Sequence, residues 1–149
     1  MINLRKYFMA VIFLSSIFFI NACGMSQNSD VIKLTADLTA EKEVPPTNSK
    51  GNGKANLEYS KKIRELRWTI NYEGLTGPIT AAHFHGPATV SENAEPTIPI
   101  EGNLASPIIG TAILTATEEN DLMKGKWYLN LHTAANPKGE IRAQISDVH

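Results

Sequence analysis

Three histidines have the residue type and spacing that a metal site requires. His83 and His85 are separated by one residue, so on a β-strand both side chains project from one face while Phe84 projects from the other. His132 lies out of phase with the apolar residues of its own segment, and we therefore expect it to face outward too. If the two strands are neighbours, three imidazoles converge on an outer face, where they suit a copper or zinc ion.

Glu140 and Arg142 share a strand face next to the turn that follows His132. In a functional interpretation Glu140 lies behind the metal ligands and orients an imidazole N–H, while Arg142 holds or steers an anion. The alternatives are an exposed cross-strand ion pair, or a rigid polar network in which these two residues satisfy the histidines. A site for an organic ligand is a third possibility.

Other motifs that carry chemistry are absent from this sequence. It contains no GxSxG, Walker or GxGxxG pattern, and its one cysteine excludes a disulfide framework and a cysteine-based zinc site. With 14 basic and 15 acidic residues the net charge is −1, which excludes a strongly basic nucleic-acid binder. No catalytic residue can be named, so a non-catalytic protein is favoured over an enzyme.

The first residues are typical of a secretory signal peptide. Arg5 and Lys6 precede an apolar stretch at residues 7–20, which is shorter than the ~20 residues needed to span a membrane. Cys23 follows directly, in Ile20-Asn21-Ala22-Cys23, which resembles a bacterial lipobox with cleavage before a lipidated cysteine. The alternative is an ordinary signal peptide cut near Ala22, with Cys23 left as a free thiol.

We therefore expect a signal peptide over residues 1–22, a lipidated tether over 23–30 and one domain over 31–149. The protein would be an extracytoplasmic lipoprotein held at a membrane by its lipid. Gly24, in place of an aspartate after the cysteine, resembles the signal for outer-membrane sorting if the host is Gram-negative.

The domain is predicted to be all-β. Apolar and polar residues alternate clearly in five segments, and two weaker segments bring the expected total to about seven strands: residues 31–38, 54–59, 66–72, 127–132 and 140–145, then 79–85 and 108–114. This pattern favours an antiparallel β-sandwich or Greek-key barrel with one apolar core and a wet outer face. Trp68 and Trp127 fall on the apolar phases and are expected in that core.

Two connecting segments carry further expectations. One short helix is predicted at residues 118–124, with Thr117 as its N-cap and Gly125 closing it. Residues 86–106 are rich in proline, glycine and polar residues, and are expected to form a long exposed loop.

Four separated phrases occur in an order that resembles the CHRD domain, named after its repeats in chordin and found in bacterial secreted proteins. They are Glu43-Val44-Pro45-Pro46, Ala82-His83-Phe84-His85-Gly86, Tyr128-Leu129-Asn130-Leu131-His132-Thr133 and Asn136-Pro137-Lys138-Gly139-Glu140-Ile141-Arg142. The resemblance covers residues 31–145. It implies an immunoglobulin-like β-barrel, distantly similar to copper-zinc superoxide dismutase. In chordin these domains lie within an antagonist of secreted growth factors.

The superoxide dismutase comparison bears on the histidines. That family binds copper with an HxH pair on one strand and a histidine on a later strand, and His83, His85 and His132 resemble those three. No other histidine lies between His85 and His132, so the bridging histidine and the zinc ligands have no counterparts. Three functions follow as hypotheses: an envelope-anchored, non-catalytic binding module of unknown ligand or protein partner, a copper or zinc protein using the three histidines, and a purely structural envelope module.

Overall fold

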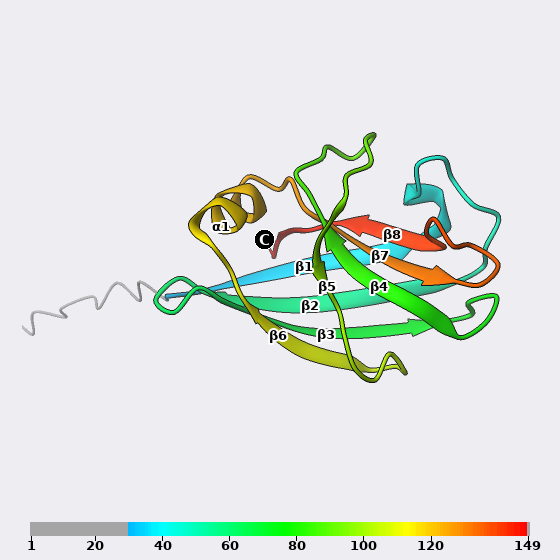
Figure 1. Ribbon diagram of the computed structural model, residues 1–149, viewed down its shortest axis with the longest axis horizontal. Coiled ribbons are helices and arrows are strands. Elements are labelled where there is room, and N and C mark those ends of the chain that lie inside the picture. The colour runs from blue at the N-terminus through cyan, green and yellow to red at the C-terminus, as the bar shows by residue number, and fades with distance from the viewer. Residues whose placement is uncertain (1–29, 149) are drawn as a thin grey trace, which may run out of the picture.

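The computed structural model describes residues 30–148 (Figure 1). The predicted signal peptide, the lipobox with Cys23, and residues 24–29 of the predicted tether lie outside the described residues. None of the helices in the described part of the chain is long and apolar enough to cross a membrane.

The described residues form mostly strands. In chain order the elements are β1 (Val31–Thr39), the 3-10 helix η1 (Ala40–Lys42), β2 (Asn52–Ser60), β3 (Glu65–Glu73), β4 (Ile79–His85), β5 (Pro96–Pro99), β6 (Ile108–Ile113), α1 (Ala116–Met123), β7 (Tyr128–Thr133), β8 (Ile141–Gln144) and β9 (Ser146–Asp147).

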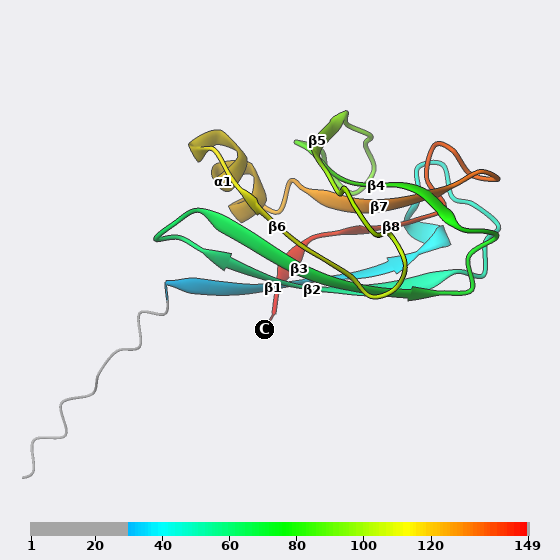
Figure 2. The same ribbon diagram turned by 60° about the horizontal axis from the view of Figure 1, so that its bottom comes forward.

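These strands form one antiparallel sheet in the order β5-β4-β7-β8-β1-β2-β3-β6, with β9 paired to β1. The sheet folds over itself and is nearly closed into a barrel. In Figure 2, β1, β2 and β3 lie in one layer while β4 and β7 lie in the other. The predicted all-β fold is confirmed, and β5 and β9 are short strands that the alternation did not predict.

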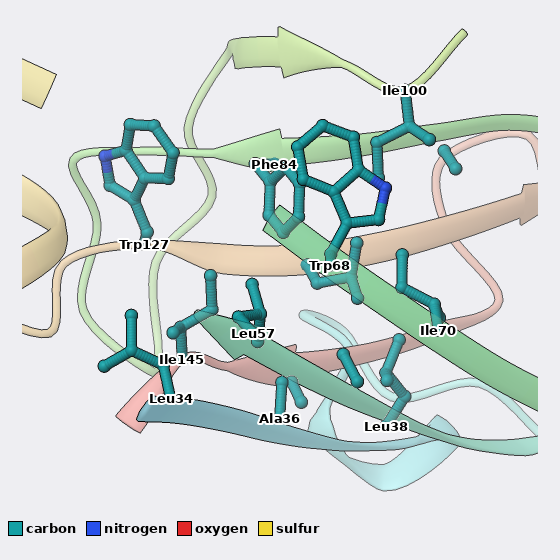
Figure 3. Packing of buried hydrophobic residues seen from close by; sticks show 14 of the residues in the cluster. Leu34, Ala36, Leu38, Leu57, Trp68, Ile70, Phe84, Ile100, Trp127 and Ile145 are labelled. Carbon is teal, nitrogen blue, oxygen red and sulfur yellow. The ribbon is translucent and has the colours of Figure 1, made fainter. Parts of the chain in front are cut away.

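The apolar core fills the space between the two layers. The longer strands contribute the apolar half of their alternation, as Leu57 on β2 and Ile70 on β3 illustrate. Trp68 and Trp127 are both buried, as predicted. Figure 3 shows the Trp68 ring against Phe84, with ring centroids 5.1 Å apart, and the Trp127 ring stacks on the same Phe84 at 6.2 Å. Phe84 therefore joins the two tryptophans, with the imidazoles of its neighbours on the opposite face of β4.

The helix forms close to where it was predicted, but its N-cap is Thr115 and not Thr117. The Thr115 hydroxyl accepts from Glu118 N at 3.3 Å, and the Glu118 carboxylate accepts from Thr115 N at 2.7 Å. This reciprocal capping box satisfies two N–H groups, and it needs a glutamate three residues after the cap. Gly125 ends the helix as predicted, with φ +66°.

Residues 86–106 are not simply an exposed loop. They contain β5, which pairs with β4, and part of the segment lies over the outer face of the sheet. As a result every residue of β7 is buried, on both of its faces. The expectation of a uniformly wet outer face is therefore wrong for β7 and β8.

Candidate metal centre on strands β4 and β7

The three histidines converge because β4 and β7 are hydrogen-bonded neighbours. In the antiparallel register His85 pairs with Tyr128, and His132 pairs with Ala81, next but one to His83. His83 Nδ1 lies 3.2 Å from His132 Nε2. One ring nitrogen from each histidine lies within 4.8 Å of one from each of the others. The residues predicted to meet on one face are therefore together, with Phe84 buried on the other.

Two backbone carbonyl groups fix how the imidazoles point. Ala94 O lies 2.9 Å from His85 Nδ1, and Pro137 O lies 3.1 Å from His132 Nδ1. Because a carbonyl oxygen only accepts hydrogen bonds, both Nδ1 atoms carry the proton, and both Nε2 atoms present a lone pair. His132 Nε2 can then accept from His83 Nδ1. His85 Nε2 is buried and has no hydrogen-bond partner among residues 30–148.

The histidines are more buried than an outer strand face implies. Only 6% of His85 and 7% of His132 is exposed, and His83 is half-buried. Burial lowers the pKa of His85 to about 4, and it lowers the pKa of His83 and His132 as well. The expectation of a wet outer face is thus wrong at His132. At neutral pH all three rings are uncharged, which is the form that binds metal ions.

A stack of side chains supports the His85 ring. Tyr128 lies parallel to His85, with ring centroids 4.7 Å apart and planes within 3°, and its hydroxyl contacts the backbone of Ala94. The guanidinium carbon of Arg142 lies 3.5 Å from the centre of the Tyr128 ring. His85, Tyr128 and Arg142 thus form three successive layers, and the ring of His85 is held on one face as well as at Nδ1.

Arg142 binds residues 89–93, which lie over the outer face of β8 and are called the covering segment below, to the sheet. Only 1% of this residue is exposed. Its Nη2 donates to Thr89 O at 3.2 Å and to Glu92 O at 2.8 Å, and its Nη1 donates to Asn93 Oδ1 at 3.0 Å. These partners occupy the donors that the hypothesised anion would have used. Arg142 therefore acts on the site by holding residues 89–93 in place.

Glu140 lies apart from the histidines. Its carboxylate accepts from Ser49 Oγ at 2.6 Å, Thr76 N at 2.7 Å and Asn136 Nδ2 at 3.1 Å, and also from the Thr76 and Thr133 hydroxyls. Burial by itself raises its pKa, but these hydrogen bonds outweigh it and lower the pKa to about 2. Glu140 neither orients an imidazole nor pairs with Arg142, because its side chain joins the loops that precede β2 and β4.

Sequence reasoning missed the Tyr128 ring and the two carbonyl groups of this site. Tyr128 shares the period-2 phase of His132, so the alternation could have placed it on the same face. The carbonyl groups of Ala94 and Pro137 had no signal in the sequence, because any residue type supplies a backbone carbonyl. They occupy the orienting position that had been assigned to Glu140.

The arrangement brings together three neutral imidazoles from two adjacent strands, and two of these rings are buried and held at Nδ1 by carbonyl groups. A family model for the CHRD domain matches residues 34–145, which is most of the chain and includes the three histidines. The chain belongs to the CHRD domain family. No curated protein and no solved structure matches it. The motifs of this CHRD domain fall on the elements just described, with the HxH pair on β4 and His132 on β7.

Proposed function

We propose that this CHRD domain is a non-catalytic binding module whose ligand is a copper or zinc ion, held by His83, His85 and His132. The observation that carries the proposal is His85 Nε2, a buried lone pair without a partner in a cluster of three ring nitrogens. Leaving such a group unsatisfied costs about 1–3 kcal/mol, and an ion at this point removes that cost.

The donor set fits these two metals. Three neutral imidazoles suit copper and zinc, whereas calcium and magnesium prefer oxygen ligands. His85 and His132 are already in the tautomer that offers Nε2, because their Nδ1 atoms face carbonyl groups. Only His83 has to change, by moving its proton from Nδ1 to Nε2. The half-buried His83 also marks the side from which an ion and a further ligand can reach the site.

We test this by thermal unfolding of the purified chain carrying Cys23→Ala, which removes a thiol that competes for metal. Copper or zinc at about 100-fold above Kd is expected to raise the melting temperature by about 5 °C or more over the chelated protein. His132→Gln abolishes the shift. His149→Gln is the matched control, because it removes the chain's fourth histidine, and it keeps the shift.

Metal analysis of the same samples distinguishes the alternatives. We expect one ion per chain in the parent protein and in His149→Gln, and none in His132→Gln. If the histidines serve only a structural network, metal leaves the melting temperature unchanged, and His132→Gln lowers it equally with chelator and with metal. That outcome would remove the metal and leave a binding module of unknown ligand or a structural module.

We propose in addition that a lipid on Cys23 anchors the domain to a membrane of the cell envelope. The support is the lipobox-like sequence that follows the apolar stretch. Cys23→Ala is expected to move the protein from the detergent phase to the aqueous phase in a partitioning experiment. A variant that still partitions with detergent, like the parent, would exclude the lipid anchor.

A further inference from the structure

Two of the four sequence motifs meet at a place outside the histidine cluster. Residues 43–47, which follow η1, and residues 135–139, which join β7 to β8, lie side by side in both views (Figures 1 and 2). Together with Asn93 they line a cleft of about 330 Å³. Its walls are largely apolar, since Val44, Pro45 and Pro137 contribute to them.

A buried carboxyl group without a full set of partners lies at this cleft. Glu43 is 5% exposed, and its Oε1 has no hydrogen-bond partner in the described part of the chain. Asn130 Oδ1, also buried, has none either. Both oxygens lie against Gly139, where a Cβ would stand 2.7 Å from Glu43 Oε1 and 2.6 Å from Asn130 Oδ1. Glu43 and Gly139 line the cleft, and Asn130 Oδ1 lies beside Glu43 Oε1 next to Gly139, so two unsatisfied acceptors adjoin the cleft.

The charge of Glu43 is also incompletely balanced. No ion pair within 4.0 Å among the described residues includes it. Arg142 attracts it through space, but the Arg142 donors are directed at residues 89–93. Burial therefore dominates and raises the pKa of Glu43 to about 7. The group that is missing is one that carries positive charge and donates several hydrogen bonds.

We propose that the cleft binds the primary ammonium group of a small amine, with Glu43 Oε1 and Asn130 Oδ1 accepting two of its protons. Lys138 O, which accepts from Asn130 Nδ2 at 3.5 Å, is a further carbonyl oxygen next to this pair. A calcium or magnesium ion fits less well, because it prefers six or more oxygen ligands. The apolar walls receive the alkyl part of the amine. This site is separate from the proposed metal centre and does not depend on it.

The probe is propylammonium. Its binding to the full chain carrying Cys23→Ala is monitored by nitrogen–proton NMR at pH 8. An alkylamine stays protonated there, as lysine does. We expect saturable shifts of the Gly139 amide and of the Asn130 side-chain amide. Glu43→Gln weakens binding at least tenfold. Glu41→Gln is the matched control: it removes the same charge from an exposed position two residues away and leaves binding unchanged. Neutral propanol and an equal concentration of sodium chloride produce no such shifts.

The pH dependence tests the proposal without any variant, in case Glu43→Gln fails to fold. Propylammonium binding is expected to weaken several-fold from pH 8 to pH 6, as Glu43 takes up a proton, while Arg142, the charged group that acts on it, stays ionised. If Glu43 instead carries a proton that it donates to Asn130 Oδ1, propylammonium produces no saturable shift at either pH. That result, or equal binding by Glu43→Gln, overturns the proposal.

Discussion

The outer face of β2 and β3 and the outer face of β7 and β8 are built from the same kind of alternating sequence, but their surroundings differ. The polar residues of the first face are exposed, as Asn56 and Arg67 show. Those of the second face are buried, including Asn130 and Arg142. Alternation thus identifies the side chains that avoid the apolar core. It does not identify which of them meet water.

The difference arises from what covers each face. On β7 and β8 the covering segments supply specific partners, such as the carbonyl of Glu92 for Arg142 and the carbonyl of Pro137 for His132. Buried polar groups need such partners, because burial without them costs free energy. Side chains on the exposed face of β2 and β3 make weak contacts, and water replaces these contacts at little cost when a side chain is removed. The same substitution is therefore expected to be costly on one face and nearly neutral on the other.

The largest effect is expected from removing the arginine on each face. Arg142→Ala removes three hydrogen bonds and the contact with Tyr128, and should lower the free energy of unfolding by about 3–5 kcal/mol. The Arg67 side chain is 66% exposed and pairs with Glu65, so Arg67→Ala should lower it by less than about 1 kcal/mol. Urea denaturation measures both. Similar costs for the two variants would mean that the outer face of β8 is not sealed.

The glutamates give the second contrast. The pKa of Glu140 is about 2 in the folded chain against an ordinary value of 4.5, so its stabilising contribution is present above pH 4.5 and is lost as the pH falls toward 2. Glu140→Gln should cost about 2–3 kcal/mol at pH 7, and the difference from the parent should shrink by pH 3.

Glu58→Gln on β2 is the control for that experiment. Glu58 is exposed on the wet face, so the substitution should change stability by less than about 0.5 kcal/mol at either pH. Denaturation midpoints at the two pH values decide the matter. A cost for Glu140→Gln that stays constant from pH 7 to pH 3 would show that the carboxylate charge contributes nothing and that only its shape matters.

Much of the fold and part of the site follow from local pattern. Period-2 alternation predicted the main strands, and the phase of His132 against Leu129 and Leu131 placed it correctly beside His83 and His85. The capping box of α1 was also readable, because Glu118 stands three residues after Thr115 and no glutamate stands three after Thr117. These features depend on neighbours along one element.

The rest depends on where distant loops run. The partners of Glu140 come from Ser49 and Thr76, 91 and 64 residues away in the chain. Whether residues 89–93 lie over β8 or extend into water is decided by hydrogen bonds such as that from Arg142 to Asn93, which no local periodicity encodes. The burial of the histidines, and with it their lowered pKa values, follows from those same loops.

The smallest expected effect concerns two pairs of side chains, one on exposed strands and one that joins β8 to residues 89–93, compared by double-mutant cycles. Asp37 Oδ1 lies 3.0 Å from Lys54 Nζ, with both side chains more than half exposed, and Asn93 Oδ1 lies at the same distance from Arg142 Nη1. The exposed pair should couple by about 0.2–0.5 kcal/mol and lose most of that in 1 M salt. The pair of buried Arg142 with exposed Asn93 should couple by about 1–2 kcal/mol and hold most of it in salt, because the hydrogen bond is made to a charged group that is only 1% exposed. The two distances are equal, so the predicted difference in coupling comes from burial, and the salt dependence shows how strongly each pair is screened. If both cycles give the same coupling and the same salt dependence, coupling depends on the distance between the two atoms alone, and the burial of Arg142 adds nothing to its hydrogen bond.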